Sequence, residues 1–99
     1  MPLFVISWSD KPGALDLRMA SREAHLAHIH AQGDKVKLGG PYLDEAGQMC
    51  GSLIIIEAES QAEAEAFHAQ DPYKLAGIFE TSTITPWRLT TEKFSQGAS

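Results

Sequence analysis

The sequence has very little cysteine. Cys50 is the single cysteine among the 99 residues, so no disulfide can form within the chain. It lies in the loop-like segment AGQMCGS and has no second cysteine with which to form a zinc knuckle or a thiol relay. We therefore interpret Cys50 as a small, half-buried packing residue, and this cysteine usage fits a reducing compartment.

Long apolar runs are also missing. The first residues, MPLFVISWSDKPG, contain only a short apolar run with no basic segment before it. This is far below the about 20 apolar residues that a membrane span needs, and it lacks the basic start of a secretory signal. We therefore expect no signal sequence and no membrane contact, and we predict a cytoplasmic protein.

Positive charge is scarce. Eight Lys and Arg residues stand against thirteen Asp and Glu residues, which gives a net charge of -5. Such a surface does not attract phosphate backbones or anionic lipids, so we expect no nucleic acid or membrane partner. The sequence also has no P-loop, dinucleotide fingerprint or nucleophile elbow, so we predict no nucleotide cofactor and no serine hydrolysis.

The remaining composition is that of one folded domain. Hydrophobic residues make up 43% of the chain and charged residues 21%, which is ordinary for a globular protein. A chain of this length forms one domain. We place that domain at residues 1–89 and expect residues 90–99 to form a polar, mobile tail.

Strand and helix patterns alternate along the domain. A capping box of Ser60 and Glu63 starts the second helix, which ends where residue 71 precedes Pro72. The Gly-Gly-Pro segment at 39–41 follows the second strand and lets a ligand or another backbone come close. The first helix begins near residue 15, or restarts at Ser21, and ends near Gly33. We expect strands at residues 3–8, 35–38, 51–57 and 79–89, helices at 15–33 and 60–70, and a short turn at 73–77.

The order strand, helix, strand, strand, helix, strand is typical of the ferredoxin-like α+β fold. Right-handed connections place both helices on one face of a four-stranded antiparallel sheet and leave the other face bare. The segment 53–56 supplies apolar side chains to both faces, as do Phe4 and Ile6 on one side against Val5 and Trp8 on the other. Exposed apolar area of that size is unfavourable in water, so we predict a homodimer packed sheet to sheet.

The first helix carries an apolar stripe beside a row of nitrogen-bearing side chains. On a helical wheel Met19, Leu26 and Ile29 share one face, with Arg22 and His25 at its edge. A helix that packs by this edge forms a wall of a polar pocket.

His25 and Asp71 are the candidate catalytic pair. If the end of the second helix approaches the first, Asp71 accepts a hydrogen bond from one ring nitrogen of His25 and leaves the other nitrogen free to exchange a proton. The alternative is that His25 is a surface residue and Asp71 only caps the turn at Pro72.

Arg18 and Arg22 are candidate binding residues because they precede His25 at intervals of one helical turn. Their guanidinium groups suit a carboxylate or phenolate, so the expected ligand is a small anionic molecule. The alternative is a solvated helix face on which Asp16 and Glu23 pair with the two arginines.

Three further positions complete the candidate pocket. Tyr73 is a possible phenol donor, although a tyrosine in a turn also serves for packing, and Gly39 and Gly40 shape the cleft. The tract H-x-x-H-x-H, completed by His28 and His30, resembles a metal motif, but its spacing lets at most two imidazoles share an ion. We expect no metal site and assign no role to these two histidines.

The sequence resembles the YciI family, or YCII-related domain, of small bacterial proteins. The matching features run in order through nearly the whole domain, namely the helix 22–26, Gly-Gly-Pro at 39–41, Gly-Ser at 51–52, Asp-Pro-Tyr at 71–73, Ala-Gly at 76–77 and Pro-Trp at 86–87. The resemblance implies a ferredoxin-like fold that dimerises into an α+β barrel, with His25 and Asp71 matching the His and Asp taken as that family's active site. Its best functional analogy is a dehydrochlorinase of chlorinated hydroxyquinol breakdown, and muconolactone isomerase is a more distant relative by fold.

These observations favour a cofactor-independent lyase, isomerase or dehydrochlorinase that acts on a small anionic metabolite, with an aromatic ring as one option. In this hypothesis His25 moves the proton, Asp71 orients it, and Arg18 and Arg22 neutralise developing negative charge. The main alternative is a non-catalytic dimeric module that binds a small ligand or a protein. A monooxygenase or haem-degrading barrel is a third possibility, based on fold analogy alone.

Overall fold

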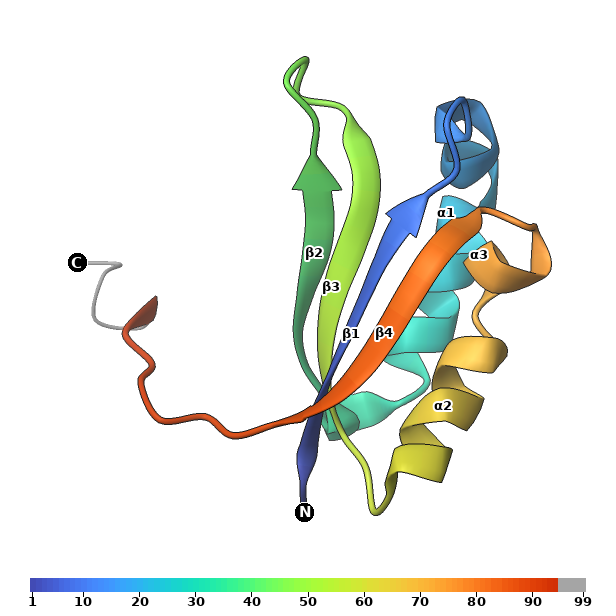
Figure 1. Ribbon diagram of the computed structural model, residues 1–99. Helices are drawn as coiled ribbons and strands as arrows, with labels where there is room; N and C mark the ends of the chain where they lie inside the picture. Colours follow the sequence, from blue (N-terminus) through green and yellow to red (C-terminus); the bar gives the residue numbers. More distant parts are fainter. Residues whose placement is uncertain (95–99) are drawn as a thin grey trace.

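The structure, a computed structural model, describes residues 1–94. Its elements are β1 (Leu3–Asp10), α1 (Leu15–His30), the 3-10 turn η1 (Gly33–Lys35), β2 (Val36–Leu43), β3 (Met49–Glu57), α2 (Gln61–Ala69), α3 (Pro72–Leu75) and β4 (Phe79–Trp87). The strands form one antiparallel sheet in the order β2-β3-β1-β4, and the helices lie on one side of it (Figure 1). The predicted ferredoxin-like α+β fold is confirmed.

Several element boundaries differ from the sequence prediction. β2 continues to Leu43 and contains the Gly-Gly-Pro segment that we had placed after it. This is possible because β2 is an edge strand, where a proline without an amide donor is tolerated. The predicted turn at 73–77 contains the short helix α3, and β4 ends at Trp87 rather than at 89. Of the predicted tail, residues 95–99 lie outside the described part of the chain.

The helix ends follow local sequence signals. The Ser60 side chain accepts a hydrogen bond from the Glu63 amide at 3.2 Å, which confirms the capping-box start of α2. α1 is continuous from Leu15, with no restart at Ser21, and ends at His30. Gly33 follows with a φ of 60°, a left-handed conformation that glycine adopts without strain, and turns the chain toward β2.

The core lies between the sheet and the helices. Phe4, Ile6 and Trp8 alternate along β1 and all face the helices, since side chains two residues apart share a face. Our placement of Trp8 on the opposite face was therefore wrong. Around them pack buried residues of β3, the loop after it, α2, α3 and the segment before β4, namely Ile54, Ile56, Ala58, Ala64, Phe67, Tyr73 and Ile78.

The buried face of α1 is more polar than predicted. Met19 is exposed, whereas Arg18 and His25 are the buried residues of this helix. Leu26 and Ile29 are half-buried. The helix therefore presents charged and titratable groups, as well as apolar ones, to the interior.

The other face of the sheet has an apolar centre. Val5 and Leu53 lie opposite the helices, and Ile55 beside them is 6% exposed. Tyr42, whose hydroxyl is 2.8 Å from the Ser7 hydroxyl, and Trp87 lie at the margins of this face. Within residues 1–94, no helix is long and apolar enough to cross a membrane.

Candidate active site

A cavity of about 310 Å³ opens between α1 and the β2–β3 hairpin. It exists because α1 packs toward α3, while β2 is left exposed along almost its whole length. Its volume is near the lower end of the about 300–1,000 Å³ usual for ligand pockets. Six of the seven predicted site residues line it, namely Arg18, Arg22, His25, Gly39, Gly40 and Tyr73.

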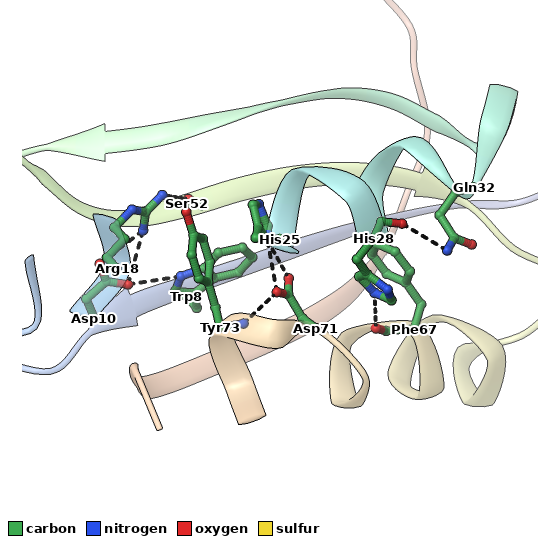
Figure 2. Close-up of polar contacts among 10 residues, drawn as sticks. All are labelled: Trp8, Asp10, Arg18, His25, His28, Gln32, Ser52, Phe67, Asp71 and Tyr73. Carbon is green, nitrogen blue, oxygen red and sulfur yellow. Dashed lines mark hydrogen bonds and ion pairs between the residues drawn. The ribbon is translucent and has the colours of Figure 1, made fainter. Parts of the chain in front are cut away.

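The seventh residue, Asp71, does not line the cavity but contacts His25, which does. Nδ1 of His25 is 2.8 Å and 2.9 Å from the two carboxylate oxygens of Asp71, across 46 positions of sequence (Figure 2). Asp71 is 0% exposed and His25 8% exposed. Because a carboxylate only accepts hydrogen bonds, Nδ1 carries the proton and Nε2 is the nitrogen left to exchange one. The alternative in which His25 is a surface residue is wrong.

Asp71 also caps α3. One of its oxygens accepts a hydrogen bond from the Tyr73 amide at 2.9 Å, and Pro72 occupies the first helical turn, where its missing amide costs nothing. Asp71 therefore caps α3 and also pairs with His25, so the alternative in which it only caps the turn is wrong. The Asp-Pro-Tyr segment folds into a short helix whose start holds the imidazole.

Tyr73 fixes the ring of His25 from one side. The two rings stack with centroids 4.0 Å apart and an angle of 9°, and the edge of Trp8 meets His25 at 6.1 Å. Burial raises the pKa of the Tyr73 phenol, and the positive charges of Arg18 and Arg22 oppose this rise. The phenol is therefore a hydrogen-bond donor at neutral pH.

Arg18 is held by an ion pair that sequence reasoning missed. It is 3% exposed, and its Nη1 donates to a carboxylate oxygen of Asp10 at 3.0 Å. Its Nη2 donates to Ser52 Oγ at 2.7 Å, and Asp10 also accepts from Trp8 Nε1 at 3.0 Å (Figure 2). For Arg18, the alternative of a solvated helix face with Asp16 and Glu23 as ion-pair partners is therefore wrong. Asp10 could have been found, because it continues the two-residue period of the buried positions on β1.

The two arginines have different roles in the geometry. The guanidinium of Arg18 lies 4.8 Å from the centroid of the Tyr73 ring, and its terminal nitrogens are occupied. It contributes a fixed positive charge beside the cavity. Arg22 is exposed at the cavity wall, and no carboxylate in residues 1–94 forms a salt bridge with it. Glu23 is therefore not its partner, and Arg22 is available to a ligand.

The other histidines lie outside this pair. Nε2 of His28 donates to the Phe67 carbonyl at 3.0 Å, and its ring stacks on Phe67, so it joins α1 to α2. His30 lines the cavity near the end of α1. His68, which no sequence signal singled out, is buried against Trp8, and its Nε2 is 2.9 Å from the Ser82 hydroxyl. Across residues 1–94, no three potential metal-binding side chains of His, Cys, Asp or Glu gather in one place.

Comparison with known proteins identifies relatives along the whole domain. The family model of the YCII-related domain matches residues 2–88. Protein YciI of Escherichia coli O6:H1 is 35% identical over 94 residues, which cover 87% of this chain and 96% of that protein. An uncharacterized protein of Haemophilus influenzae is 34% identical over 94 residues, covering 86% of this chain and 95% of its own length.

Solved structures agree with this relationship. The structure of TftG, a 5-chloro-2-hydroxyhydroquinone dehydrochlorinase from Burkholderia phenoliruptrix in complex with 2,5-dihydroxybenzoquinone, is 35% identical with a TM-score of 0.82. The match covers 89% of this chain and 95% of that one. An antibiotic biosynthesis monooxygenase with a TM-score of 0.57 and 11% identity, covering 92% of this chain and all of its own, shares the fold alone. The resemblance predicted from the sequence is confirmed, and the chain belongs to the YCII-related family.

Proposed function

We propose that the cavity is the active site of a cofactor-independent enzyme that moves a proton on a small anionic ring compound. The observation that carries this proposal is the buried pairing of His25 with Asp71 at a cavity that Arg22 also lines. A buried imidazole held by a carboxylate, with its second nitrogen free, suits general acid and base catalysis.

The reaction begins with His25 Nε2 taking a proton from an acidic O–H or C–H of the substrate. In an elimination from a chlorinated ring, His25 first delivers this proton to the ring carbon that bears chlorine, which gives a keto tautomer. His25 then takes a second hydroxyl proton, the electron pair of that O–H bond forms a new C=O double bond, and chloride departs with its own bonding pair as the ring double bond shifts to the carbon it leaves. In an isomerisation, His25 returns the proton at another atom. Asp71 stabilises the imidazolium in both cases, while Arg22 and the fixed charge of Arg18 stabilise the anionic intermediate.

The relationship to TftG favours the elimination. That protein is named as a dehydrochlorinase, and its structure holds 2,5-dihydroxybenzoquinone, a doubly hydroxylated ring that is acidic and planar. An identity of 35% over most of both chains supports a related substrate class here. We therefore propose a chlorinated or otherwise substituted polyhydroxylated ring as the substrate of this enzyme.

The test uses 5-chloro-2-hydroxyhydroquinone and follows chloride release and quinone absorbance. We expect His25→Gln to lower kcat by about 100- to 10,000-fold, the usual contribution of a positioned acid or base. His28→Gln is the matched control, because it removes an imidazole of the same helix that contacts α2 instead of Asp71. Chloride release by His25→Gln at the wild-type rate would overturn the mechanism, and tight binding without conversion by the wild type would favour the non-catalytic module.

The apolar centre of the open sheet face supports a homodimer as the working form. Val5 and Leu53 are half-buried there without a covering helix among residues 1–94, and apolar area of this kind is favourably buried against a second copy. Light scattering should give twice the chain mass. Leu53→Asp should yield monomers, whereas Leu75→Asp, on the exposed surface of α3, should not. A wild-type monomer at all concentrations would refute the dimer.

A further inference from the structure

The cavity has two ends of different character along α1. Arg18 and Arg22 lie toward the start of the helix, with Ser52 of β3 across from them, and His25 follows near the middle. Toward the end of the helix the lining becomes apolar, with the side chains of Leu26, Ile29, Val36 and Ile54. Met49 of β3 also lines the arginine end and His30 lies at the other, so the polar and apolar groups predominate at opposite ends of the cavity without a strict division.

The length of this lining exceeds what a single ring needs. From Arg18 to His30 the helix runs about 18 Å at 1.5 Å per residue. Arg22 and His25 are only about one turn, or about 5 Å, apart along the same axis. A ring held by Arg22 beside the imidazole therefore leaves the end near Ile29 and Val36 unfilled.

This unfilled end also exposes apolar surface. Leu26, Ile29 and Val36 are half-buried and line this end. Each square ångström of such surface costs about 25 cal/mol while it faces water. A ligand group that covers it gains that free energy on binding.

We propose that the apolar end of the cavity is a subsite for an alkyl or similarly apolar substituent, so that the preferred ligand is an anionic ring bearing an apolar chain. This proposal narrows the substrate class of the proposed function. It rests on the proposed function only for the identity of the ring. The anionic part binds at Arg22 and His25, and the chain runs along α1 past Leu26 toward Ile29 and Val36. Exposed His30 lies beyond, at the end of the lining.

The first experiment varies the ligand and leaves the protein unchanged. Calorimetry measures the Kd of 2,5-dihydroxybenzoquinone and of its 3-methyl, 3-propyl and 3-hexyl derivatives. We expect Kd to fall by about two- to fourfold per methylene while the chain is being buried, since one fully buried methylene corresponds to about fourfold. A Kd that stays constant or rises with chain length overturns the subsite.

A second ligand series separates this inference from the proposed function. Butanoate, hexanoate and octanoate carry a carboxylate for Arg22 but no ring and no reactive proton. If the quinones do not bind while affinity for the carboxylates still rises with length, the ring assignment fails and the subsite stands. If neither series gains affinity with length, the subsite is wrong whatever the enzyme does with rings.

Matched variants test whether the gain in affinity with chain length arises at the apolar end of the cavity. Leu26→Ser removes an apolar wall of the subsite, and Leu17→Ser makes the same change on the same helix at a position that does not line the cavity and is 45% exposed. We expect Leu26→Ser to raise the Kd of the 3-hexyl ligand by about five- to tenfold. The Kd of the parent quinone should change by no more than about twofold. Leu17→Ser should change neither, and equal losses in the two variants would contradict the placement of the chain.

Discussion

The helix-facing side of the sheet contains two regions of opposite character. Over β1 and the start of β4, the helices pack closely enough to leave Ile6 and Ile78 with no exposed surface. Over β2, no residue is fully buried, and the space under α1 is the cavity. We call these regions the packed half and the open half. The same sheet face thus forms a core where helices touch it and a cavity, the proposed binding site, where α1 stands away from it.

His25 and Asp71 lie at the boundary between the halves. Asp71 is buried at the start of α3 in the packed half, while His25 reaches the open half from α1. In the proposed enzyme, the core would supply the rigidity that a catalytic imidazole requires, and the open half would supply access to the ligand. The following predictions change one half at a time.

The largest effect is expected at Asp71, because this residue both caps α3 and pairs with His25. Asp71→Ala removes the cap of α3 and leaves Nδ1 of His25 buried without its partner, so we expect a loss of about 3–5 kcal/mol of unfolding free energy. Asp71→Asn keeps an oxygen for the Tyr73 amide and should lose less stability, while kcat falls because the amide cannot stabilise an imidazolium. Urea unfolding and turnover measure the two effects. Equal stability of the two variants would show that the cap contributes nothing.

The next effect compares the halves directly. Ile6→Ala creates a cavity in the packed half and should cost about 2–5 kcal/mol. Val36→Ala in the open half removes two half-buried methyl groups and should cost about 1 kcal/mol or less. Denaturant midpoints measured at constant m-value give both numbers. Losses of similar size would mean that the two halves are not energetically distinct.

A smaller effect, on ligand affinity alone, is expected at Gly39. A Cβ at this position would meet the Ile54 side chain at 3.4 Å, an ordinary contact on the cavity side. Gly39→Ala should therefore fold normally. It should raise the Kd of 2,5-dihydroxybenzoquinone by about tenfold, because the added methyl group takes space in the cavity, and this loss is within the usual cost of overpacking. Gly40→Ala is the control: the Gly40 backbone lines the cavity, but this residue pairs with Leu53, so its added Cβ lies on the other face and meets nothing within 4 Å. If both variants bind alike, Gly39 does not shape the site.

The smallest effect is expected in the pH dependence of stability, and it involves His68 in the packed half. Burial lowers the pKa of His68 below 6.5, with the charge of Asp71 opposing and that of Lys74 assisting the decrease. The unfolded chain then binds a proton at a higher pH than the folded one, so stability is lost as pH falls from about 6.5 through the lowered pKa. In His68→Gln this part of the pH dependence should disappear when unfolding is followed from pH 7.5 to 5. An unchanged slope would show that His68 is protonated equally in both states.

Local patterns predicted the order of elements and much of the site. The capping box at Ser60 and the proline after Asp71 determine helix ends through neighbouring residues, so they can be identified without a structure. The pairing of His25 with Asp71 followed from the fold, which places the two helices side by side. The positions of Gly39 and Tyr73 at the cavity followed in the same way.

Tertiary packing decided what the sequence did not reveal. Arg18 resembled a surface arginine, because burial of a charge depends on a partner, here Asp10, that lies on a different element and is brought close only by the packing of α1 on β1. Trp8 was placed on the wrong face although its spacing from Ile6 carried the answer. His68 gave no signal, since a histidine in a short helix is buried or exposed according to which strand lies beneath it.

The wall strand of the cavity is also the edge of the sheet, and this has a consequence for solubility. An uncovered edge invites pairing with the edge of another molecule, which leads to aggregation. β2 carries Lys37, which lies 3.9 Å from Glu57, and Pro41, whose ring has no amide to offer a foreign strand. These two residues disfavour pairing of β2 with a strand of another molecule, while this edge of the sheet stays accessible to small molecules.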